Sequence, residues 1–158
     1  MTTLYQALLS DPERGERLAA QCLLLIETQV ASRPRVRRIA LRAGMAVLNA
    51  IQPDAVIDAV RRLLPDFTTA LDPLYQQFRQ SEHQDFSPFL EAHPDEAVQA
   101  LLVVTDRHVR DGDSGAVRAA YGRLRGIAET EVHAALPGLA RVLSDHLPRS
   151  CDPLTQAA

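Results

Sequence analysis

The feature that most constrains the fold is a Leu-Pro-x-apolar motif that occurs twice, as Leu64-Pro65-Asp66-Phe67 and as Leu136-Pro137-Gly138-Leu139. Each copy ends one apolar-periodic stretch and begins another, because proline suits the first turn of a helix and disrupts its interior. The flanks also match at a constant offset of 72 (136 − 64), which pairs Val60 with Val132. The motif predicts a helical chain built from two related halves.

Helical spacing of apolar residues, together with proline- and aspartate-rich helix starts, predicts the secondary structure along the chain. No stretch alternates between apolar and polar residues for long enough to form a strand, so we predict an all-α fold, a multi-helix orthogonal bundle of about eight helices. We expect their apolar sides to be buried against one another. The predicted helices cover residues 4–9, 12–30, 34–51, 53–64, 65–79 with a break or kink at Pro73, 86–90, 94–109, 117–136 as one helix or two, and 137–147.

The domain organisation follows from the same pattern. We predict one helical domain over residues 1–147, with pseudo-repeated halves at 1–79 and 86–147 joined by a polar connector, and a flexible C-terminal tail over 148–158. Proline also recurs at helix starts for local reasons, so a duplication and a chance match both remain open.

Composition bounds the class of protein. An apolar fraction of 46% with 23% charged residues is typical of a globular chain, and 4% aromatics without tryptophan predict a core of Leu, Val, Ala and Ile. The net charge of −3 favours neither a nucleic-acid nor a membrane partner. All seventeen basic residues are arginine, so no mechanism that uses a lysine as nucleophile or base is available.

The densest charged feature is the arginine cluster from Arg33 to Arg42. Arg35, Arg38 and Arg42 recur at i, i+3 and i+7, which places them on one helix face. One interpretation is an anion or ligand site, because arginine binds carboxylates and phosphates with two parallel hydrogen bonds. The interpretation we favour is a solvated face paired with acidic residues of the second half, which carries the excess negative charge.

Catalytic and metal-binding patterns are absent from the sequence. It has no HExxH, P-loop, G-x-G-x-x-G or G-x-S-x-G motif, and we therefore predict no catalytic residue, no metal and no cofactor. Cys22 lies in an apolar run and is expected to be a buried, inert thiol. Whether the five histidines converge in a site stays open; they are His83, His93, His108, His133 and His146.

The expected location in the cell follows from targeting and membrane signals that the sequence lacks. The first residues lack a charged segment followed by an apolar stretch, and no apolar run is long enough to cross a bilayer. We therefore expect a soluble cytoplasmic protein with no membrane association.

Several segments resemble an uncharacterised small all-helical bacterial family, a domain of unknown function. The resemblance covers residues 1 to about 147, and it implies a stand-alone cytosolic helical protein. Because such a family has no established activity, it implies no functional residue. The segments that carry the resemblance are Leu64-Pro65-Asp66-Phe67 with Leu71-Asp72-Pro73, residues 100–106 (ALLVVTD), residues 120–125 (AYGRLR) and residues 134–139 (AALPGL).

Four functions remain in competition at this level, and the last of them is an enzyme of unfamiliar type whose active site would assemble from residues far apart in the sequence. The first is a non-enzymatic helical interaction or scaffold protein that binds a protein partner or self-associates. The second is a module that binds a small acidic or apolar ligand between the two halves, with Arg35, Arg38 or Arg42 as the polar anchor. The third is weak nucleic-acid binding through the Arg33–Arg42 cluster, which we consider unlikely because no aromatic residue interleaves the arginines for base stacking.

Overall fold

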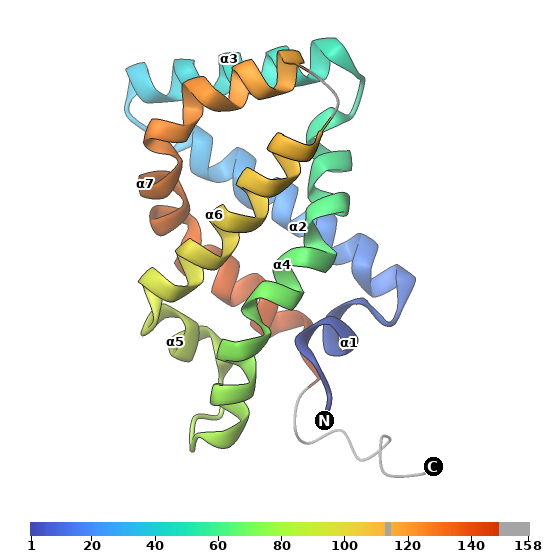
Figure 1. Cartoon of the computed structure of the whole chain (residues 1–158). Coiled ribbons are helices and arrows are strands. Elements are labelled where there is room, and N and C mark those ends of the chain that lie inside the picture. Colours follow the sequence, from blue (N-terminus) through green and yellow to red (C-terminus); the bar gives the residue numbers. More distant parts are fainter. Residues whose placement is uncertain (113–114, 149–158) are drawn as a thin grey trace.

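The computed structural model describes residues 1–112 and 115–148, and this part of the chain contains seven α-helices and no strand. The prediction of an all-α fold is therefore confirmed. The predicted tail, from residue 149 onward, lies outside the described residues. The helices are α1 (Leu4–Leu9), α2 (Pro12–Ala31), α3 (Arg35–Ile51), α4 (Ala55–Gln80), α5 (Phe86–Glu91), α6 (Pro94–Asp111) and α7 (Gly115–His146) (Figure 1).

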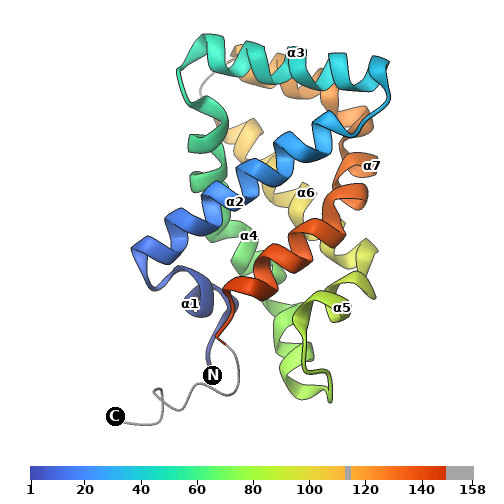
Figure 2. The ribbon, with the colours of Figure 1, turned by 180° about the vertical axis from the view of Figure 1, so that it is seen from behind.

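The count of about eight helices is wrong because two predicted helix boundaries are not boundaries. Pro65 and Pro73 lie inside α4, and Pro137 lies inside α7. A proline removes one backbone hydrogen bond, but burial of the side chains around it can outweigh that loss. Leu64 is 5% exposed and Leu136 is 2% exposed. The Leu-Pro motif therefore marks a buried point within a long helix, and α7 changes direction along its length in both views (Figures 1 and 2).

Among the described residues the buried core consists mainly of leucine, alanine and valine, as the composition predicts, but it includes aromatic rings and no isoleucine. Every helix except α3 contributes buried residues to it within the described part of the chain. Four aromatic side chains gather where α4 meets α5, and the Tyr75 and Phe86 rings meet edge to face with 5.5 Å between their centroids. The largest fully buried side chains are those of Phe86, Leu4, Leu8, Leu18, Leu71, Leu90, Leu136, Val98, Val104 and Thr68.

Each short helix is tied to a long one by an aspartate. The Asp72 carboxylate of α4 accepts a hydrogen bond of 2.6 Å from the Leu4 backbone N–H at the start of α1. Asp85 accepts one of 2.9 Å from the Ser87 N–H of α5 and one of 2.5 Å from the Ser144 hydroxyl of α7. Helix starts need such acceptors because their first N–H groups have no partner within the helix. The resemblance between the two halves stays a prediction, since it also follows from shared helix-start chemistry.

Two glycines of α7 differ in their surroundings and should respond oppositely to substitution. A Cβ at Gly126 would meet nothing within 4 Å, so Gly126→Ala should raise the free energy of unfolding by about 1 kcal/mol through helix propensity. A Cβ at Gly138 would overlap the Leu25 side chain of α2, so Gly138→Val should lower the free energy of unfolding. Urea denaturation measures both, and a stabilised Gly138→Val variant would contradict the described contact between α7 and α2.

Candidate functional site

Helix α3 is the element with the least involvement in the core. It lies across one end of the bundle beside the first part of α7, far from the N-terminus (Figures 1 and 2). None of its 17 residues is buried. It comes close to α7 at Gly44, where an added Cβ would lie 2.7 Å from Cδ1 of Leu124. Since α3 is attached by one side only, its opposite side faces solvent.

The two sides of α3 are both apolar. The side that faces the bundle carries Leu41, Met45 and Leu48, each half-buried. The outward side carries exposed apolar residues at helical spacing, although the sequence analysis expected the apolar sides of the helices to be buried. That prediction is wrong for this side of α3, because the opposite side with its leucines makes the contacts with the bundle. The outward residues, which we call the α3 stripe, are Val36 (83% exposed), Ile39 (60%), Ala40, Ala43, Ala46, Val47 (43%), Ala50 and Ile51 (46%).

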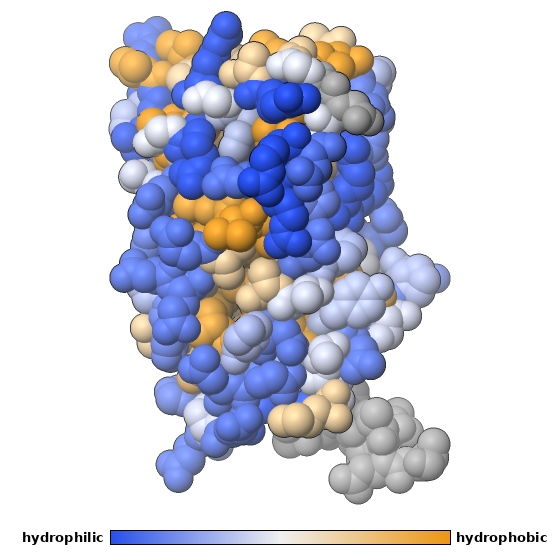
Figure 3. Space-filling view, viewed as in Figure 1, coloured by the Kyte–Doolittle hydropathy of each residue, from blue (hydrophilic) through white to orange (hydrophobic). Residues whose placement is uncertain are grey.

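Figure 3 shows the face on which the first part of α7 lies in front of α3, and hydrophobic and strongly hydrophilic side chains alternate at this end of the molecule. A basic edge with an apolar centre is typical of a surface that binds another protein segment rather than water alone.

Two of the five clustered arginines are paired with an acid of the second half, which fits the interpretation we favoured for these two residues only. Glu131 of α7 lies 3.1 Å from Arg33 Nε through one carboxylate oxygen and 3.1 Å from Arg37 through the other. The Glu131 side chain is 15% exposed and that of Arg33 is 19% exposed. The Arg33 Nε and Glu131 Oε1 atoms make no hydrogen bond within the described residues, so the attraction is mainly Coulombic. This pairing holds the start of α3 onto α7.

The other three arginines, Arg35, Arg38 and Arg42, make no side-chain hydrogen bond or ion pair in the part of the chain that the structure describes. Arg35 and Arg42 are exposed, and Arg38 is half-buried. Their spacing places them along one edge of the α3 stripe. Anion or ligand binding by these three residues stays a prediction.

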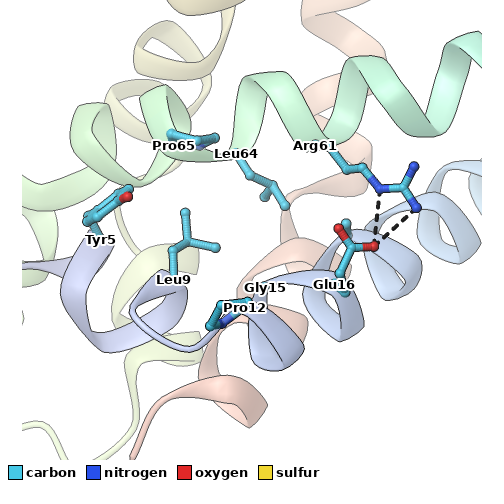
Figure 4. A pocket seen from close by; sticks show the side chains of 9 residues that line it. Tyr5, Leu9, Pro12, Gly15, Glu16, Arg61, Leu64 and Pro65 are labelled. Carbon is cyan, nitrogen blue, oxygen red and sulfur yellow. Dashed lines mark hydrogen bonds and ion pairs between the residues drawn. The ribbon is translucent and has the colours of Figure 1, made fainter.

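A pocket of about 270 Å³ lies elsewhere, between α1, α2 and α4 (Figure 4). All of its lining residues belong to the first half, and none of the unpaired arginines of α3 is among them. Arg61 at its edge already contacts Glu16 at 3.1 Å and Asp58 at 3.0 Å, so its charge is compensated. The pocket is lined by Tyr5, Leu9, Pro12, Gly15, Glu16, Ala19, Arg61, Leu64 and Pro65.

The histidines do not converge. His108 Nε2 lies 2.6 Å from Asp66 of α4, whereas His133 Nε2 lies 3.6 Å from Asp95. The rings of the other three contact nearby groups of their own segments: Ser81 for His83, the Phe89 carbonyl for His93 and the Val142 carbonyl for His146. No group of three or more His, Cys, Asp or Glu side chains within residues 1–112 and 115–148 is placed to hold a metal ion.

Partly exposed polar side chains link helices to one another. Asp106 of α6 accepts hydrogen bonds from Arg125 Nε at 2.8 Å, from another nitrogen of the same guanidinium at 3.0 Å and from the Tyr121 hydroxyl at 2.7 Å. The Arg125 guanidinium holds the pKa of Asp106 below its ordinary value. Burial and the bond to Asp106 raise the pKa of Tyr121. Burial also raises the pKa of Cys22 to about 11, so this residue stays a protonated thiol near neutral pH, as its sequence context predicts.

The sequence singled out Arg35, Arg38 and Arg42 on α3, whereas the exposed apolar stripe beside them is the more unusual feature of this surface. The sequence does show apolar residues on both sides of this helix, but spacing alone does not say which side is buried.

Comparison with known proteins places the chain in a family. A model of a family of unknown function (DUF6918) matches residues 5–147, and the chain belongs to this family. The match confirms the resemblance seen in the sequence. No curated protein and no solved structure matches the chain. No helix in the described ranges is both long and apolar enough to cross a membrane.

Removal of the charge on Glu131 should destabilise the fold more than removal of an exposed acid. Glu131→Gln leaves Arg33 half-buried without a counter-charge, and we expect the free energy of unfolding to fall by about 1 to 3 kcal/mol. Glu16→Gln is the matched control, because Glu16 is 62% exposed in its pair with Arg61. Chemical denaturation of both variants checks this, and equal effects would mean that the contact of Glu131 with Arg33 adds nothing.

The Asp106 link should make stability depend on acid. Because its folded pKa is lowered, its contribution is fully present above the pKa of an unfolded aspartate, about 4, and is lost as pH falls through the folded value. Asp106→Asn should therefore lower stability at pH 6 and reduce the further loss between pH 6 and pH 3. Asp145→Asn serves as control, since that residue is exposed. An unchanged acid dependence in Asp106→Asn would refute this role.

Proposed function

We propose that this member of the family of unknown function is a non-enzymatic interaction protein that binds a protein partner through the α3 stripe. One observation carries the proposal: a helix of 17 residues has no buried residue, and four large apolar side chains on it are 43% to 83% exposed. Single exposed apolar residues are ordinary in folded proteins, but here they follow one face of one helix.

The energetic argument concerns water. Each Å² of apolar surface removed from water contributes about 25 cal/mol, so covering the α3 stripe stabilises a complex without any change in the bundle. The unpaired arginines beside the stripe then provide selectivity, because they favour partners with acidic residues at the matching edge. A central apolar strip with a charged rim is the usual anatomy of a protein interface.

The chemistry of the other polar groups supports a role without catalysis. Asp66, Asp72, Asp85, Asp106 and Glu131 all contact neighbouring helices and serve the fold. The one cysteine within the described residues has a raised pKa, which opposes a role as nucleophile. We place this function in the bacterial cytoplasm, in line with the expectation from the sequence.

The two other binding functions, nucleic-acid binding and small-ligand binding, have weaker support than protein binding. Two of the five clustered arginines, Arg33 and Arg37, already share Glu131, which reduces the positive field available to a nucleic-acid backbone. A small acidic or apolar ligand held by Arg35, Arg38 or Arg42 remains an alternative, but the pocket in Figure 4 lies away from these residues.

Site-specific photocrosslinking in cells tests the proposal. A benzophenone amino acid at Ile39, on the α3 stripe, should give discrete crosslinked protein species. The same amino acid at Leu24 of α2, which is 62% exposed, is the matched control and should give none. The absence of crosslinks from Ile39, or the same products from both positions, would contradict a binding role for α3.

A further inference from the structure

We infer that the partner of the α3 stripe is a second copy of this chain, and that the two α3 helices pack antiparallel about a two-fold axis at Ala43. The inference rests on the proposed function and adds the identity of the partner. It follows from the symmetry of the exposed residues, from their sizes and from the charges at the two ends of the helix.

The exposed apolar positions mirror one another about position 43. In an antiparallel pair centred there, Val36 faces Ala50 of the other copy, Ile39 faces Val47, and Ala43 faces its own equivalent. A two-fold interface requires this property, because the same patch must complement itself. Ile51 is the one member of the stripe that lies outside the mirrored set.

Residue size favours a close approach of the two helices. Ala40, Ala43 and Ala46 occupy the middle of the stripe, and the larger Val36, Ile39 and Val47 lie toward its ends. Alanines at the crossing point allow helix axes to approach to about 8 Å, the short end of the range for packed helices. In the antiparallel register Val36 then lies beside Ala50 of the other copy, and Ile39 lies beside Val47. The apolar contact therefore continues on both sides of the crossing point.

Charge fixes the direction of the pair. Arg35, Arg38 and Arg42 lie in the first half of α3 without partners, and no charged residue follows until Asp54, just past its end. Asp54 is exposed, has the left-handed φ of 62° and makes no side-chain cap to α4. A helix of 17 residues is about 25 Å long, so these arginines cannot reach Asp54 of their own chain.

Antiparallel packing brings these opposite charges together at both ends. Side chains of a helix lean toward its N-terminus, so Arg35 extends toward the end of the partner's α3 and the segment that carries Asp54. The partner's last carbonyl groups also carry partial negative charge, which offsets the unfavourable placement of arginines near the start of α3. A parallel pair would instead set all three arginines beside their equivalents, whereas in the antiparallel pair only Arg42, next to the axis, lies near its equivalent.

The size of the surface sets the expected affinity. One face of a single helix is at the lower end of known interfaces, so we expect a reversible dimer with a Kd in the micromolar range.

Analytical ultracentrifugation of the purified chain over a concentration series should show monomer passing to dimer. Ala43→Glu, which sets two carboxylates side by side at the axis, should weaken the dimer at least tenfold. Leu24→Glu on α2 should leave it unchanged, and circular dichroism confirms that both variants stay folded.

Thiol crosslinking tests the register. In a Cys151→Ser background, Ala43→Cys should be joined to itself by a short bismaleimide. Val36→Cys alone and Ala50→Cys alone should not react with themselves, whereas a mixture of the two should give a crosslinked pair. Self-reaction of Val36→Cys without reaction in the mixture would indicate a parallel pair and overturn the inference.

The outcomes separate this inference from the proposed function. If the purified chain stays monomeric at all concentrations while Ile39 photocrosslinks to a different protein in cells, the second copy is excluded and the interaction role stands. If Ile39 also gives no crosslinks, both fail. Binding of the monomeric chain to anionic lipid vesicles, lost in Ala43→Glu, would replace the second copy by a membrane surface and overturn the inference.

Discussion

The buried leucines beside the internal prolines are the interaction on which the rest of the structure depends. Leu64 and Leu136 lie in the core next to Pro65 and Pro137, and they keep α4 and α7 helical through the residues that interrupt their hydrogen bonding. Helices α1, α2, α5 and α6 pack against one or both of these long helices. If either long helix ended at its proline, the others would lose a continuous surface to pack on.

The exposure of α3 is a consequence of that arrangement. The core is closed by the other six helices, so α3 meets only the first part of α7, α4 and the end of α2. Its leucine side and the Glu131 contact hold it there, and its alanine, valine and isoleucine side has no partner within the described chain. A surface helix kept apolar on its outward side is a liability for a monomer, because it promotes association. The proposed function depends on this tendency of the α3 stripe to associate.

The polar residues have a consistent role as connections between helices. Aspartates bind helix starts, arginine or histidine on neighbouring helices, and this satisfies groups that would be costly to leave unpaired in a partly buried site. The arginines at the edge of the α3 stripe and Asp54 depart from this pattern. These unpaired charges border the exposed apolar strip, which is why the proposed function assigns the binding surface to α3.

Much of the fold was determined by the sequence alone, and the exposure of the α3 stripe was not. Helical spacing and start signals predicted the all-α class, the bounds of the short helices 4–9 and 86–91 to within a residue, and the burial of Cys22. Proline chemistry is local, so it could not show that α4 and α7 continue through Pro65 and Pro137 once leucines on both sides are buried. Likewise, periodicity identified apolar residues on α3 but not their direction. Only the tertiary structure decided that, because two apolar sides competed for contact with the bundle and the leucine side became half-buried against it.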